Sequence, residues 1–220
     1  MKRPLYLDRL PYKAQPLKSR LCALAIATVA FSFYGWSLET LLFAVKFGEF
    51  CDRGLLTLPL CPMYGLTVLS IYALLRTPLD GVWKAFCKKG RTRVTRALRF
   101  FLCFLAYIAL TAALATLVEL STALFYHKAY GVRLWNYYLK DCNYKGYISL
   151  RYSLIWGVLA ALSMAFIWRP TLRALVRLPE NTLYPLAVLL MTALVLDFAF
   201  NSAYLHCHGR RLIVEALERL

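Results

Sequence analysis

Three acidic residues stand inside long apolar stretches of the chain: Glu39, Glu119 and Asp197. An arginine follows each acid by 14 residues, counted from 39 to 53, from 119 to 133 and from 197 to 211. Charged side chains within apolar segments are costly and generally face a bundle interior or a water-filled cavity. The candidate binding residues are therefore Glu39, Arg53, Glu119, Arg133, Asp197 and Arg211, with Arg151 as a further cation.

Glycines near these arginines suggest how the pairs would form. Gly48, Gly54, Gly131 and Gly209 lie close to the arginines, and a glycine-broken turn would bring each arginine back over its acid. Three such pairs would surround one polar, outward-facing site that binds a substrate or an ion. The alternative is that the pairs only hold helices together, since each partner removes the other's cost of burial.

The composition indicates the environment in which such pairs would work. The 220 residues are 60% hydrophobic, and the net charge is +16. The mean hydropathy is +0.54. The apolar residues gather into long runs, which is typical of membrane proteins and argues against a nucleic-acid-binding domain. The bilayer is therefore the first expected partner, and basic loops would meet its anionic headgroups.

Five apolar segments predict membrane-spanning helices, at about residues 21–45, 56–75, 99–126, 150–168 and 183–206. Each is close to or above the roughly 20 residues that a helix needs to cross a bilayer, and none alternates with the period of a strand. We expect an all-α polytopic membrane protein of about five spans. Its single transmembrane domain would cover 21–206, between a basic tail at 1–20 and a short amphipathic tail at 207–220.

The charged loops predict an orientation. The regions 1–20, 76–99 and 169–177 hold 17 of the 27 lysines and arginines, and they share one side of a five-span chain. Positively charged loops stay in the cytoplasm. The protein is therefore expected in the cell membrane, with its N-terminus in the cytoplasm and its C-terminus outside the cell.

The second apolar segment has features of a broken helix. Pro59 and Pro62 remove backbone donors near its start, and Gly54 and Gly65 flank them. Residues 54–65 are therefore expected to form a broken or re-entrant segment, which membranes accept only where it is buried in protein or lines a cavity. The alternative is an ordinary helix start marked by proline.

Several kinds of chemistry lack their motifs in this chain. The sequence has no G-x-x-x-x-G-K-[ST] phosphate-binding loop, no G-x-S-x-G and no H-E-x-x-H. The cysteines form no C-x-x-C pair, and no Cys/His cluster has zinc spacing. We expect no cofactor, no metal and no ATPase or hydrolase activity in this chain.

Two stretches, SFYGWSLETLL with CDRGLLTLPLCPMYG and LVELSTALFYHKAYGVRLWNYYLKDCNYKGYISLRYSLIWG, carry a combined motif. Its elements include Gly35, Trp36, Glu39, Arg53, Gly54, Pro59, Pro62, Tyr64, Gly65, Glu119, Trp135, Tyr137, Asn143, Gly146, Arg151, Trp156 and Gly157. Over roughly residues 31–160 the chain resembles the CmpB-type family of bacterial membrane proteins, described as ABC-transporter permeases and related to vertebrate multi-pass transmembrane proteins. It departs from the family pattern at Asp52, Leu58 and Asn136.

The resemblance implies a permease-like component of a transporter, working with a separate ATP-binding subunit. Three alternatives stay open on the residues alone. They are a stand-alone ion- or proton-coupled carrier, which would need a homodimer; an intramembrane enzyme acting on lipids; and a scaffold or sensor that transports nothing. The sequence names no substrate.

Overall fold

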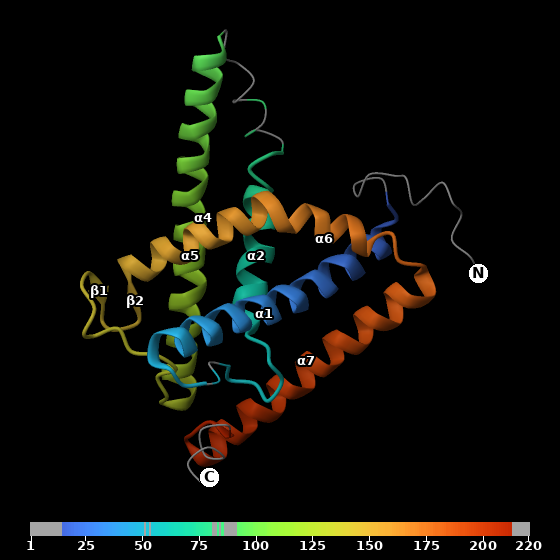
Figure 1. Ribbon diagram of the computed structural model, residues 1–220. Coiled ribbons are helices and arrows are strands. Elements are labelled where there is room, and N and C mark those ends of the chain that lie inside the picture. Colours follow the sequence, from blue (N-terminus) through green and yellow to red (C-terminus); the bar gives the residue numbers. More distant parts are fainter. Residues whose placement is uncertain are drawn as a thin grey trace. The chain divides into compact units, whose positions relative to one another are not determined.

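The computed structural model describes residues 15–50, 52, 54–80, 83, 85 and 92–212. Arg53, most of the predicted basic tail and residues 213–220 of the predicted amphipathic tail lie outside this part. Helices dominate the described residues (Figure 1): α1 (Leu17–Phe47), α2 (Pro62–Leu75), α4 (Arg93–Tyr130), α5 (Leu150–Leu162), α6 (Trp168–Leu175) and α7 (Glu180–His208). A short antiparallel pair, β1 (Asn143–Tyr144) and β2 (Ile148–Ser149), precedes α5.

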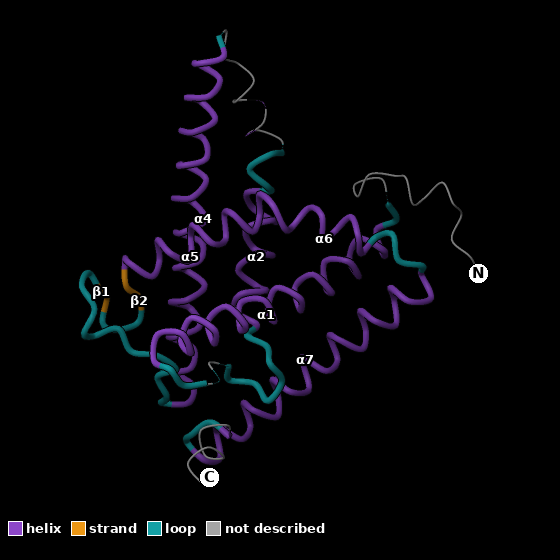
Figure 2. The backbone as a smooth tube through the Cα atoms, viewed as in Figure 1, coloured by secondary structure: helices purple, strands orange, loops and turns teal. Residues whose placement is uncertain are grey.

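Four helical stretches are long and apolar enough to cross a membrane: Leu17–Phe47, Arg93–Tyr130, Leu150–Leu175 and Glu180–His208. The predicted all-α membrane architecture is thereby confirmed. The second predicted span differs from the others, because α2 has only 14 residues and a length of about 21 Å. It begins at Pro62 rather than near residue 56, and the residues just before it are not helical (Figure 2).

The helices that carry the three acids end in the same way. Gly48, Gly131 and Gly209 follow α1, α4 and α7, and their φ angles are 77°, 69° and 69°. Their N–H groups donate to carbonyls four residues earlier, at Ala44, His127 and Leu205. A left-handed glycine is a common helix terminator because it has no Cβ to clash. The chain therefore turns sharply after each acid-bearing helix.

The chain divides into two compact units, which are described separately. The first comprises residues 1–66, 125–134 and 171–220, and the second comprises 67–124 and 135–170. In the first unit α1 and α7 lie side by side (Figure 1). Ile26 of α1 packs with Leu183 and Ala187 of α7. A second cluster joins both helices to the chain before α2: Val29, Leu56, Leu60 and Leu194.

In the second unit a close helix contact joins α4 to α5. Gly157 lies against Ala112, and a Cβ at Gly157 would collide with the Ala112 side chain and backbone. Thr111 Oγ1 donates to the Gly157 carbonyl at 3.0 Å. Small residues let membrane helices approach closely and form such side-chain hydrogen bonds.

A π-helical turn, Ser163–Ile167, connects α5 to α6 without ending the helix. The N–H of Trp168 donates to the Ser163 carbonyl, five residues back. Pro170 explains the wider turn, because it has no N–H to donate and its ring would crowd the carbonyl of residue 166. The turn keeps Leu150–Leu175 a continuous span.

Candidate functional site

The non-helical segment 54–61 reaches the middle of two spanning helices in the first unit. The Cys61 N–H donates to the Ser32 carbonyl at 3.0 Å, and Ser32 is the middle residue of α1. Leu56 and Leu60 pack with Leu194, which is the middle residue of α7. The middle of the 31-residue α1 lies about 23 Å from either end. The segment therefore lies at the depth where the membrane interior is expected, and α2 starts from that depth.

Asp197 holds this segment through its carboxylate. Its Oδ2 accepts a hydrogen bond from the Leu58 N–H at 2.9 Å, and its Oδ1 accepts one from Asn201 Nδ2 at 2.9 Å. Asn201, which is 3% exposed, also donates to Thr57 Oγ1 at 3.0 Å. A backbone N–H outside a helix needs such an acceptor where water is absent. Residues 54–61 are thus non-helical, and Asp197 satisfies part of their backbone. Because α2 begins at Pro62, both the predicted broken segment and the alternative of a helix start marked by proline fit this stretch.

Glu39 is held by the first turn of α2. The Tyr64 hydroxyl donates to Glu39 Oε2 at 2.7 Å. The Tyr64 ring lies over Gly35, where a Cβ would collide with the ring. Gly35 and Glu39 are four residues apart and therefore share a face of α1. The glycine makes room for the ring, and the carboxylate binds its hydroxyl.

Glu119 has a similar partner in the second unit. The Tyr137 hydroxyl donates to Glu119 Oε1 at 3.0 Å, and Glu119 is 4% exposed. The Tyr137 ring stacks on Tyr152 of α5, with ring centroids 4.9 Å apart. Each of the two glutamates therefore binds a phenol from its own unit, which removes part of the cost of burying the carboxylate.

The arginines predicted to pair with the acids lie at separate places in the structure. Arg211 Nη1 approaches the Gly54 carbonyl at 3.5 Å, at the edge of hydrogen-bonding distance. Arg133 lies in the loop after α4, and Arg151 is an exposed residue of the first turn of α5. Arg53 lies outside the described residues. The acid–arginine pairing stays a prediction.

Motif residues in the first unit shape the turn before the segment. Trp36 Nε1 and the Gly54 N–H both donate to Asp52 Oδ1 at 2.7 Å. Gly65 lies against the Thr28 carbonyl and the Ser32 hydroxyl, so any side chain there would collide with α1. These contacts give Trp36, Gly54 and Gly65 a structural role around the segment.

Motif residues in the second unit organise the loop between α4 and α5. Trp135 Nε1 donates to the Tyr147 carbonyl at 2.8 Å. Asn143 Nδ2 donates to the Lys140 carbonyl at 2.8 Å, and its Oδ1 accepts from the Gly146 N–H at 3.0 Å. Gly146 has a φ of 73°, which favours glycine. The loop is thus tied by its own hydrogen bonds.

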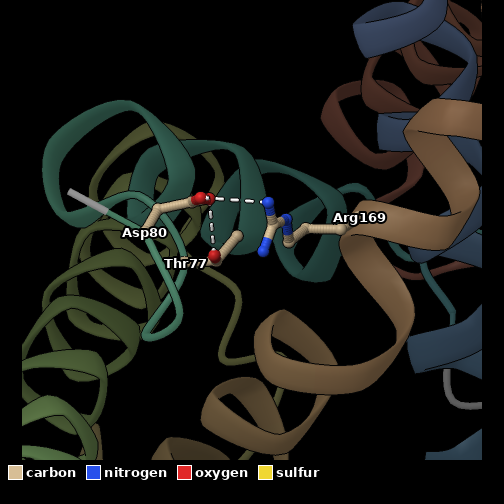
Figure 3. A network of polar contacts seen from close by, with 3 residues as sticks. All are labelled: Thr77, Asp80 and Arg169. Atoms are coloured by element: carbon tan, nitrogen blue, oxygen red, sulfur yellow. Dashed lines mark hydrogen bonds and ion pairs between the residues drawn. The ribbon is translucent and has the colours of Figure 1, made fainter. Parts of the chain in front are cut away.

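The structure adds polar residues that the sequence analysis did not single out. Asn201 and Thr57 lie with Asp197 at the segment. Asn201 follows Asp197 by four residues and Thr57 precedes Leu58 by one, but only the folded structure shows that these positions are close together. In the second unit, Asp80 accepts from Thr77 Oγ1 at 2.7 Å and pairs with Arg169 at 3.1 Å (Figure 3). This pair connects the turn after α2 to the start of α6. In the sequence, the turn motif Thr-Pro-Leu-Asp is the feature that indicates a polar turn here, and it does not indicate the ion pair.

The described residues contain no group of three or more His, Cys, Asp or Glu side chains that would hold a metal ion. The polar groups in contact with segment 54–61 include the carboxylate of Asp197, which binds the Leu58 N–H, and the amide of Asn201, which binds the Thr57 hydroxyl.

Comparison with known proteins identifies the family. The family model described as "Putative ABC-transporter type IV" matches residues 26–202, which is most of the chain and extends beyond the stretch that carries the motifs. No curated protein and no solved structure matches the chain. With its long apolar helices and this match, the chain is a membrane protein that belongs to the CmpB-type family of ABC-transporter proteins.

Proposed function

We propose that this chain is the membrane-embedded subunit of a transporter, that a separate ATP-binding subunit works with it, and that the substrate passes segment 54–61. The observation that carries the proposal is the 2.9 Å contact between Asp197 Oδ2 and the Leu58 N–H near the middle of α7. Irregular backbone at such a depth lines substrate and ion sites in other transporters.

The half-length helix α2 supports the same proposal. It starts at Pro62 near the level of Ser32 and runs for 14 residues. The N-terminus of a half-helix carries partial positive charge, while Asp197 and Glu39 supply negative charge on the neighbouring helices. A passing solute would therefore meet both signs of charge, and Arg133, Arg151 and Arg211 are the cations proposed to balance the acids or bind an anionic group.

The proposed orientation places the N-terminus in the cytoplasm of the cell and the C-terminus outside. Its support is the charge of α4, whose first two turns carry Arg93, Arg96 and Arg99. At 38 residues, α4 is about 57 Å long and exceeds the roughly 40–45 Å of a complete bilayer. Its arginine end would thus project into the cytoplasm, toward headgroups and the ATP-binding subunit.

The first experiment is purification of the tagged chain from its native host in mild detergent, followed by mass spectrometry. A stoichiometric partner with a phosphate-binding loop is expected. The solute content of a deletion strain would then be compared after complementation with wild type, Asp197→Asn or Asp80→Asn. Asp197→Asn should fail to restore transport at normal yield, while Asp80→Asn should restore it, because Asp80 lies outside the segment.

Each alternative has its own outcome. Recovery of the chain alone, with gradient-driven uptake in liposomes, would identify a stand-alone carrier, and a homodimer would be its expected form. Altered lipids without a solute defect would identify a lipid-active enzyme. If Asp197→Asn is merely recovered at low yield, Asp197 has only a structural role and the scaffold alternative gains support.

A further inference from the structure

The first turns of α4 carry cations and no acid. Three arginines stand there: Arg93, Arg96 and Arg99. The sequence has no acidic residue between Asp80 and Glu119, and Asp80 pairs with Arg169. Arg96 is exposed, and its Nε donates to the Thr92 carbonyl at 3.4 Å. Its two Nη atoms have no partner among the described residues, so they are available to an anion from outside the chain.

An apolar collar follows these arginines directly. It consists of the successive residues Phe100, Phe101 and Leu102, which point to three different sides of α4. Their exposed fractions are 48%, 58% and 52%. Apolar side chains exposed on several sides of a helix are more stable in hydrocarbon than in water. The collar is therefore expected to lie at the edge of the hydrocarbon layer, with Arg99 one residue outside it.

The helical rise then gives the depth of each arginine. At about 1.5 Å per residue, Arg99 lies about 2 Å, Arg96 about 6 Å and Arg93 about 11 Å beyond Phe100 along the axis. The headgroup layer is about 5–7 Å deep on each side of a bilayer. Arg99 and Arg96 are thus expected at the level of the lipid phosphates, whereas Arg93 reaches the water beyond them.

Two phenyl rings continue the face of Arg96 toward the hydrocarbon. Phe100 and Phe104 follow Arg96 at intervals of four residues, so all three lie on one face of α4. The two ring centroids are 6.3 Å apart, and the rings are nearly parallel, at 5°. Arg99 neighbours Arg96 on the helix surface because it follows by three residues. This face therefore presents two guanidinium groups at one end and a flat apolar wall below them.

We propose that this face of α4 binds one anionic phospholipid, with the phosphate at Arg96 and Arg99 and an acyl chain along Phe100 and Phe104. The guanidinium group matches phosphate oxygens in geometry and charge. A soluble acidic protein or a free phosphate ion could contact the arginines but would leave the two rings uncovered. Under the proposed orientation the lipid belongs to the cytoplasmic leaflet. Its binding requires neither ATP nor a transported solute, so the inference does not rest on the proposed function.

Native mass spectrometry of the purified, delipidated full chain tests the headgroup contact. The chain is titrated with phosphatidylglycerol or with phosphatidylcholine that has the same acyl chains. The wild type should bind phosphatidylglycerol at least about tenfold more tightly, as expected for two cations at an anionic headgroup. The double variant Arg96→Gln with Arg99→Gln should lose this preference. The matched control is Lys128→Gln with Lys140→Gln, which removes two exposed cations beyond the other half of α4 and should keep the preference.

A second pair of variants tests the acyl-chain contact. Phe100→Ala should weaken the binding of both lipids several-fold, because the wall below Arg96 loses one ring. Leu102→Ala is its control, since Leu102 is similarly exposed, at 52%, on another side of the helix. It should bind both lipids like the wild type. Excess inorganic phosphate should not displace phosphatidylglycerol from the wild type, because a free ion makes no contact with the rings.

Three results of the titration would overturn the proposal. They are equal affinity of the wild type for the two lipids, an equal loss in the arginine and lysine variants, and displacement of the lipid by inorganic phosphate. The arginine variant could also keep its lipid preference yet no longer co-purify with an ATP-binding subunit. This face would then be a protein-docking surface, and the proposal would fail.

The comparison of the two lipids on the wild type needs no variant, so a misfolded variant leaves that part of the test intact. The titration contains no ATP-binding subunit. A negative result therefore leaves the transporter proposal standing, and a failure to recover such a subunit leaves the lipid site standing.

Discussion

The Tyr64 hydroxyl lies 2.7 Å from Glu39 Oε2, while the ring of the same tyrosine covers Gly35, four residues earlier on α1. One aromatic side chain thus connects the start of α2 to a glycine and a carboxylate on a single helical face. The contact couples the non-helical segment to α1, because Tyr64 is the third residue of the helix that this segment leads into.

Replacing Tyr64 by Phe should destabilise the protein by about 1–3 kcal/mol, because Glu39 loses the hydroxyl that binds it while the ring still fills the space over Gly35. Thermal or denaturant unfolding in mild detergent measures the loss. Tyr144→Phe is the matched control, since its ring is 53% exposed on the loop before α5 and it should be nearly neutral. Equal effects of the two substitutions would contradict the role given to the Glu39 contact.

Gly65→Ala should destabilise the protein by at least about 1–3 kcal/mol, because the new methyl group would collide with the Thr28 carbonyl and the Ser32 hydroxyl. Adding Ser32→Ala should give little rescue, since the backbone of Thr28 remains in place. Gly131→Ala serves as the comparison. Nothing lies within 4 Å of its added Cβ, so only its left-handed backbone, at φ 69°, would be strained. A Gly65→Ala protein as stable as the wild type would show that α1 and α2 are not this close.

Cysteines at Thr57 and Asn201 should cross-link in a background without the native cysteines, because these side chains approach to 3.0 Å. Mild oxidation or a bifunctional thiol reagent, followed by mass spectrometry of the digested chain, detects the bond. The pair Thr57→Cys with Leu189→Cys should fail, since Leu189 lies 12 residues away along α7 and is 65% exposed. Efficient cross-linking of that second pair would contradict the placement of segment 54–61 at mid-depth.

Leu139→Cys should react with a membrane-impermeant maleimide in intact cells, because Leu139 is 97% exposed in the loop that the charge distribution places outside. Thr92→Cys, at the exposed start of α4, should react only after the cells are permeabilised. Both variants use the same background without native cysteines. The opposite pattern of labelling would invert the proposed orientation.

Much of the architecture follows from local properties of the chain. Long apolar runs predict spanning helices because backbone groups in hydrocarbon must bond within their own segment. Pro59 and Pro62 predict the break before α2 because a proline cannot donate a hydrogen bond. The boundary was less accurate, since the apolar run begins near residue 56 whereas the helix begins at Pro62. Hydropathy does not distinguish an apolar helix from an apolar non-helical segment that packs between two helices.

The sequence by itself therefore determined the membrane class, the acid-bearing helices and the place where the second span breaks. Only the tertiary structure decided which groups bind the acids. Tyr64 lies 25 residues after Glu39, and Leu58 lies 139 residues before Asp197. The regular spacing between acids and arginines is a property of the sequence. Whether two groups form a hydrogen bond depends on which segments lie close together in the folded protein. The cost of an unpaired N–H or carboxylate away from water then selects the nearest partner, whatever its distance along the sequence.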